Sequence, residues 1–179
     1  MKYDIGYITK YMIEYDSGVP LSVIFGISLF VCVIIIILYH YSTNGIKFLR
    51  NASWCILGGY LFFIFCVTIL FRDKTTEAHY ALRPLWSYGV LYNKLLAQNI
   101  LNVLMFIPIG FLFSCSLREK NIIIIIGIGC CISMTTEILQ LVTRRGVFNI
   151  DDIIHNILGC AIGYGVFRLC NTILINHIK

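Results

Sequence analysis

The segment 122–142, IIIIIGIGCCISMTTEILQLV, decides the fold class of this chain. It holds one charged residue, Glu137, and its length matches the ~20 apolar residues that a helix needs to cross a bilayer. Four other segments of similar length are also almost free of charge: 21–41, 54–71, 99–117 and 153–175. The sequence therefore predicts an all-α, polytopic membrane helix bundle of about five transmembrane helices.

The composition of all 179 residues also indicates a membrane protein. Hydrophobic residues make up 59% of the chain and charged residues only 13%, against about 25% charged residues in a soluble domain. This balance excludes an ordinary water-soluble enzyme, a disordered chain and a disulfide-stapled secreted module. The basic residues behind the net charge of +5 lie between apolar blocks, which favours a membrane surface over nucleic acid as the electrostatic partner. The eight cysteines lie in apolar segments without metal-ligand spacing, so we expect no metal centre built on them and no other cofactor.

The connections between the spans indicate how the chain is organised. Residues 1–19 carry charges and one apolar helical face, which predicts an interfacial N-terminal segment, followed by a single membrane domain over residues 20–179. The longest connection, 72–96, is rich in aromatic residues and predicts a surface element between the second and third spans. Lysine and arginine residues are divided between the two faces. Their raw number favours the face with the N-terminus as the inside, whereas the cleaner basic bias of the short loops favours the N-terminus outside and the C-terminus inside, which is the orientation we expect.

Polar residues recur on single faces of the predicted helices. Glu137, Gln140 and Arg144 follow each other at i, i+3 and i+7, while Asp152 and Asn156 stand at i and i+4. Because successive spans alternate in direction, the starts of the third and fifth spans and the end of the fourth lie at one membrane face. We therefore expect a polar site there, formed by Arg83, Asn99, Asn102, Glu137, Gln140, Arg144, Arg145, Asp151, Asp152 and Asn156.

The residue types in this predicted site are compatible with several roles. Arginine forms two-point contacts with planar anions such as phosphate. Glu137, Asp151 and Asp152 are the candidates for a general base or metal ligand in an enzyme, and either aspartate can cap the helix that follows it. An ion-pair network that locks the helices together and binds nothing is the remaining alternative.

Four motifs follow one another in the second half of the chain. The segment RPLW at 83–86 precedes NILNVLMFIPIGF at 99–111, EILQ at 137–140 and RGVFNIDDIIHNILG at 145–159. In this order, and at these membrane positions, they resemble the VanZ-like family over about residues 70–168. Asn149 departs from the family pattern, in which an acidic residue is frequent at this position. The resemblance implies a multi-pass protein of a bacterial cell membrane, related to one that confers resistance to the lipoglycopeptide teicoplanin.

The polar site and the resemblance together lead to one main hypothesis and two alternatives. The main hypothesis is binding of an anionic membrane lipid or lipid-linked cell-wall precursor. The alternatives are a membrane enzyme that acts on a polyprenyl phosphate or envelope glycan, and a small lipid translocator that works as a homo-oligomer. Under the main hypothesis the ligand-binding residues are Arg83, Asn99, Asn102, Gln140, Arg144, Arg145 and Asn156.

Overall fold

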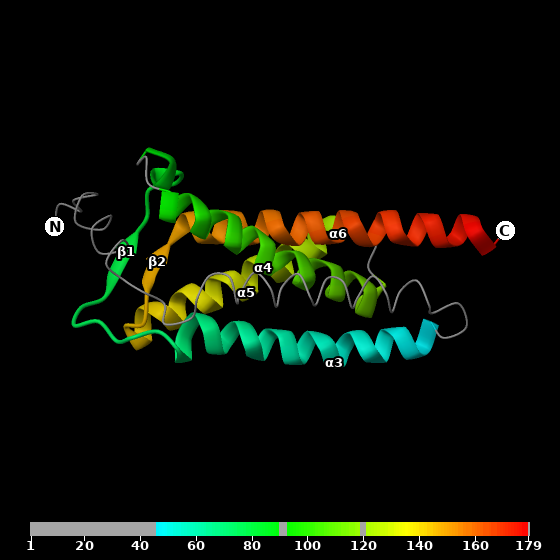
Figure 1. Ribbon diagram of the computed structural model, residues 1–179, viewed down its shortest axis with the longest axis horizontal. Coiled ribbons are helices and arrows are strands. Elements are labelled where there is room, and N and C mark those ends of the chain that lie inside the picture. Colours follow the sequence, from blue (N-terminus) through cyan, green and yellow to red (C-terminus); the bar gives the residue numbers. More distant parts are fainter. Residues whose placement is uncertain (1–45, 90–92, 119–120, 179) are drawn as a thin grey trace.

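The computed structural model describes residues 46–89, 93–118 and 121–178 as a bundle of long helices with two short strands across one end (Figure 1). The helices are α3 (Ile46–Phe65), continued by the π-helical turn η1 (Cys66–Leu70), α4 (Asn93–Leu117), α5 (Ile122–Thr143) and α6 (Ile150–Ile178). Four stretches are long and apolar enough to cross a membrane: Asn51–Leu70, Leu95–Leu117, Ile122–Thr143 and Ile150–Thr172. The expected helical membrane bundle is confirmed. The predicted span 21–41 and the interfacial segment 1–19 lie outside the described residues.

α4 and α6 run in the same direction and approach each other closely at glycines. Gly159 and Gly163 of α6 pack against the α4 backbone, the latter at Ile107, while Gly110 of α4 packs against the backbone of Cys160. A β-carbon at any of these three glycines would overlap a facing backbone carbonyl group. Helices in lipid gain little from the hydrophobic effect, so close backbone packing of this kind is a main source of their association.

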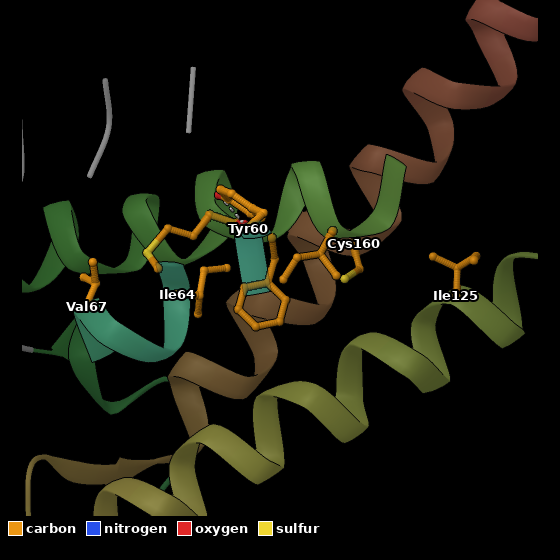
Figure 2. Packing of buried hydrophobic residues seen from close by; sticks show 8 residues of the cluster. Tyr60, Ile64, Val67, Ile125 and Cys160 are labelled. Atoms are coloured by element: carbon orange, nitrogen blue, oxygen red, sulfur yellow. Dashed lines mark hydrogen bonds between the residues drawn. The ribbon is translucent and has the colours of Figure 1, made fainter. Parts of the chain in front are cut away.

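Apolar side chains fill the interior of the bundle below its polar end. Figure 2 shows Tyr60, Ile64 and Val67 from α3 and η1 in one buried cluster with Ile125 of α5 and Cys160 of α6. The hydroxyl group of Tyr60 is satisfied because it donates to a backbone carbonyl oxygen of α4, 2.9 Å away. The α4 members of the cluster are Met105, Phe106 and Ile109.

Two three-residue strands cross the end of the bundle at which α4 and α6 begin (Figure 1). β1 (His79–Ala81) pairs in parallel with β2 (Val147–Asn149), and Ala81 lies opposite Asn149. β1 belongs to the predicted surface element, which continues in the 3₁₀ helix η2 (Trp86–Gly89). The sequence analysis did not predict these strands, because each is very short and its partner is distant in the chain.

The glycine contacts between α4 and α6 generate a stability prediction. We expect Gly163→Ala to lower the thermal unfolding midpoint in detergent, because the new methyl group meets the rigid backbone of Ile107 and Phe111. Overpacking of this kind costs about 1–3 kcal/mol. Gly165→Ala is the matched control on the same helix, where nothing lies within 4 Å of the added β-carbon. If both variants unfold at the wild-type temperature, close glycine packing does not hold these helices.

Candidate functional site

The predicted polar residues gather at the end of the bundle where α4 and α6 begin and α5 ends. Most of them come from α4, α5 and α6 and lie inside the protein, although charged and amide groups are costly to bury in a membrane-spanning bundle, while Arg83 and Arg145 come from connecting segments. Such groups are retained when they are paired or functional. Six of them have at most 6% of their surface exposed: Asn99, Glu137, Gln140, Asp151, Asp152 and Asn156.

Asn149 joins the loops and helices at this end of the bundle. Its backbone N–H donates to Oε2 of Glu137 at 2.8 Å, and its side-chain Nδ2 donates to Oδ1 of Asp152 at 2.8 Å. Its Oδ1 atom accepts hydrogen bonds from the indole N–H of Trp86 and from the backbone N–H of Asp151. The last bond makes Asn149 the N-cap of α6. The sequence analysis gave this role to Asp151 or Asp152, and the structure corrects it because both carboxyl groups have other partners.

The carboxyl group of Asp151 holds the loop that precedes η2. It accepts the backbone N–H of Leu85 and both the backbone N–H and the hydroxyl group of Ser87. Asn99 donates from Nδ2 to the same hydroxyl oxygen at 2.9 Å. Asp151 is completely buried, so these donors replace the hydration that its carboxyl group loses. The arrangement is that of a structural clamp.

Glu137 and Asp152 share the positive charge of Arg72. The Arg72 guanidinium group lies within electrostatic reach of both carboxyl groups, and the side-chain amides of Gln98 and Asn102 lie beside Asp152. The sequence analysis did not select Arg72 for the site. Arg72 could have been selected from the sequence, since it is the first charged residue after the second span and lies at the same predicted membrane face as Arg144 and Arg145.

Gln140 and Asn156 lie on either side of this charged group along the helices. Gln140 donates from Nε2 to the carbonyl oxygen of Thr68 at 3.3 Å, and Asn156 donates from Nδ2 to Oγ of Ser133 at 2.8 Å. Within the described part of the chain, neither amide oxygen accepts a hydrogen bond. A β-carbon at Gly146 would lie 2.9 Å from Oε1 of Gln140, so the glycine leaves room for that amide.

The three predicted arginines occupy different places. Arg83 is exposed at the loop surface, and Arg144 ends α5 in the left-handed conformation (φ 54°) with its side chain exposed. Nη1 of Arg144 donates to the carbonyl oxygen of Thr76 at 3.2 Å. Arg145 is half-buried and caps the end of η1. The carbonyl groups at this helix end lack partners within the helix and are therefore free to accept hydrogen bonds from its side chain. Its Nη1 donates to the carbonyl oxygens of Ile69, Leu70 and Arg72.

Arg144 and Arg145 also line a groove of about 570 Å³ between the end of η1 and the end of α5. Lys74 adds a third cation, and the described lining includes no acidic side chain. The walls are apolar and open towards the surface, since Val142 is 72% exposed and Leu70 is 48% exposed. The remaining lining residues are Phe65, Ile69, Thr75, Leu139 and Thr143. We refer to this feature as the basic groove.

The predicted residues thus divide into two groups. Glu137, Asp151, Asp152 and the buried amides form the interior network, whereas Arg144 and Arg145 reach the basic groove. Arg83 belongs to neither group. Trp86, Ser87 and Lys74 take part in the network or the groove but were not selected from the sequence, although Trp86 lies within the RPLW motif.

Comparison with known protein families agrees with this arrangement of motifs and helices. A family model described as VanZ/LLP1 matches residues 25–171. The chain belongs to the VanZ/LLP1 family. The matched region includes all residues of the interior network and of the basic groove. Searches of curated proteins and of solved structures found no match.

The hydrogen bonds of Asn149 lead to a prediction for this VanZ/LLP1 protein. Asn149→Leu leaves the buried N–H groups of Trp86 and Asp151 without an acceptor. We expect the free energy of unfolding to fall by about 2–6 kcal/mol, since each of the two unsatisfied groups costs about 1–3 kcal/mol. Trp86→Phe is the comparison: it removes one donor but keeps Asn149, so it should cost about 1 kcal/mol for the hydrogen bond in addition to the packing of the larger buried ring. Unfolding in detergent, followed by circular dichroism, measures both. Equal stability of Asn149→Leu and wild type would contradict the central role of Asn149.

Proposed function

We propose that this membrane protein binds an anionic, lipid-linked component of a bacterial cell envelope in the basic groove. The observation that carries the proposal is the combination of three cationic side chains with apolar walls at the end of two membrane-spanning helices. A phosphate group attached to a long apolar chain has the complementary combination. The volume of about 570 Å³ also lies within the usual range of ligand pockets, about 300–1,000 Å³.

The charge balance of the basic groove favours an anion. The groove lies at the C-terminal ends of η1 and α5, and each helix end carries roughly half a negative charge. Together they contribute about one negative charge, against the full positive charges of Lys74, Arg144 and Arg145. Arg145 also donates directly to carbonyl oxygens at the end of η1, which reduces their repulsion of an anion.

The apolar walls allow a lipid to enter from the bilayer. Val142 and Leu70 are exposed on the outer surface of the bundle, so the groove is open to the side on which acyl or prenyl chains lie. Undecaprenyl phosphate, a lipid-linked wall precursor and an anionic phospholipid share the required phosphate and chain. Sequestering such a molecule would change the target that a lipoglycopeptide meets, which fits the teicoplanin resistance associated with the VanZ-like family.

In this proposal the interior network positions the groove. Arg72 connects both features, because its side chain faces Glu137 and Asp152 while its carbonyl oxygen accepts the hydrogen bond of Arg145. Glu137 and Asp152 therefore hold Arg72, and Arg72 in turn holds the side chain of Arg145 in the groove. Gln140 contributes to the same junction, since its carbonyl oxygen accepts the backbone N–H of Arg145.

A steric variant tests whether lipid occupies the basic groove. Val142→Trp fills the groove without removing a charge, and we expect the purified protein to lose most of its bound undecaprenyl phosphate after incubation with this probe. Ile123→Trp is the matched control, because Ile123 is on the same helix, is equally exposed at 72%, and lies outside the groove. Mass spectrometry of retained lipid gives the readout. Equal retention by both variants would refute the proposed location.

A charge variant tests the cationic rim. Lys74→Gln should weaken binding of undecaprenyl phosphate about ten- to hundredfold, since a hydrogen bond to a charged group contributes roughly 1.5–3 kcal/mol. Lys74→Arg should keep the binding, because it keeps the positive charge. Arg118→Gln should leave binding unchanged, because Arg118 follows the C-terminal end of α4 and does not line the basic groove. When the protein is expressed in a teicoplanin-sensitive bacterium, Lys74→Gln should lower the resistance relative to wild type at equal protein levels, whereas Lys74→Arg and Arg118→Gln should not. Conversion of the probe into a dephosphorylated product would instead establish the enzymatic alternative.

A further inference from the structure

The loop between β1 and α4 presents large apolar side chains on its outer surface. Leu82 is 57% exposed, Leu85 is 56% exposed and Tyr88 is 54% exposed. Arg83 stands among them and is also exposed. We refer to Leu82, Leu85 and Tyr88 as the apolar tip. None of the three lines the basic groove, and the proposed lipid binding gives them no role.

The apolar tip is held in place by buried groups rather than by its own conformational preference. Leu85 has a left-handed backbone (φ 58°), which is unfavourable for a residue with a β-carbon. The hydrogen bond from its N–H to the carboxylate of Asp151 opposes this cost. The neighbouring Ser87 is bound to the same carboxylate through two donors. These bonds hold the backbone of Leu85 while its side chain stays 56% exposed.

The same contacts determine the depth of the apolar tip relative to the bilayer. Asp151 is the second residue of the membrane-spanning stretch Ile150–Thr172, so the loop bound to it lies level with the start of that span. Tyr88 reaches further along α6, because its hydroxyl group bonds to Nε2 of His155 at 2.7 Å. His155 lies about 7.5 Å along the helix axis from Ile150, at about 1.5 Å per residue.

The surroundings of Tyr88 on α6 belong to the outer surface of the bundle. Nδ1 of His155 lies beside the carbonyl oxygen of Asp151, and its Nε2 shares a hydrogen bond with the hydroxyl group of Tyr88. Ile154 and Leu158, on the neighbouring positions of α6, are 39% and 49% exposed within a span that crosses the membrane. Tyr88 thus contacts α6 at a residue that exposed apolar side chains flank along the helix.

We propose that the apolar tip is a membrane anchor: Leu82, Leu85 and Tyr88 insert into the headgroup layer of the membrane that the helices cross, and Arg83 binds the phosphate groups of its anionic lipids. Apolar and aromatic side chains with a nearby arginine are the combination found at membrane interfaces, where the cation reaches the headgroups while the apolar groups lie below them. The anchor supplies a lipid contact separate from the basic groove.

The experiment places an environment-sensitive fluorophore in the tip of the full-length protein. Dansylalanine replaces Leu85 by amber suppression, which avoids the native cysteines, and the protein is reconstituted in vesicles of phosphatidylcholine and phosphatidylglycerol. We expect blue-shifted emission that is quenched by lipids with a spin label near the headgroup and is insensitive to iodide in the water. The controls carry the same fluorophore at Phe62, 67% exposed on α3, as a lipid-facing position, and at Glu77 as an exposed loop position.

Each result decides the proposal. Quenching by shallow spin-labelled lipid supports insertion. Quenching by iodide alone places the tip in water and overturns it. Protection from both quenchers means that protein, such as residues 1–45 or a second copy, covers the tip, and also overturns it.

The contribution of Arg83 is measured in the same vesicles. We expect lipid quenching at position 85 to increase with the phosphatidylglycerol content, Arg83→Gln to abolish this increase, and Arg83→Lys to retain it. An unchanged lipid dependence in Arg83→Gln would remove Arg83 from the anchor. Since neither Arg83 nor Leu85 lines the basic groove, these results are independent of undecaprenyl phosphate retention.

Discussion

Asn149 uses its backbone N–H, its side-chain oxygen and its amino group in hydrogen bonds within the protein, and the polar end of the bundle is assembled around it. These bonds reach Glu137 on α5, Asp152 on α6 and Trp86 on the loop before α4. A buried polar group in a membrane-spanning bundle has little water with which to bond, so each group that Asn149 satisfies would otherwise cost about 1–3 kcal/mol. An amide is suited to this position because it both donates and accepts.

The acids and the arginines of the predicted site have separate physical roles. Asp151 is fully buried, and its carboxyl group accepts hydrogen bonds from Leu85 and Ser87. It therefore connects α6 to the loop between β1 and α4. Arg144 and Arg145 stand at the ends of helices, where their guanidinium groups are only partly used by backbone carbonyl groups. The structural role considered from the sequence therefore fits the hydrogen bonds of Asp151, while ligand binding at the arginines stays a prediction.

The interior of the bundle is polar at one end and apolar beyond it. Asn156 and Ser133 form the deepest hydrogen bond between the side chains of α5 and α6 among the described residues. The cluster that contains Ile125 and Cys160 follows on the same two helices (Figure 2). Hydrogen bonds therefore join α5 and α6 at one end of the bundle, and apolar packing joins them beyond it.

The sequence by itself determined that the chain is a helical membrane protein, where its described spans lie, and which membrane face collects the polar residues. These properties depend on hydropathy and helical periodicity, which are local in the chain. Only the tertiary structure decided that Arg72 faces Glu137 and Asp152, that Asn149 rather than an aspartate caps α6, and that Arg83 lies apart from Arg144 and Arg145. Such pairings join residues from distant segments, and they depend on how the loops cross the end of the bundle. That path is set by the β1–β2 pairing and the Asp151 clamp, for which spacing along the chain carries no signal.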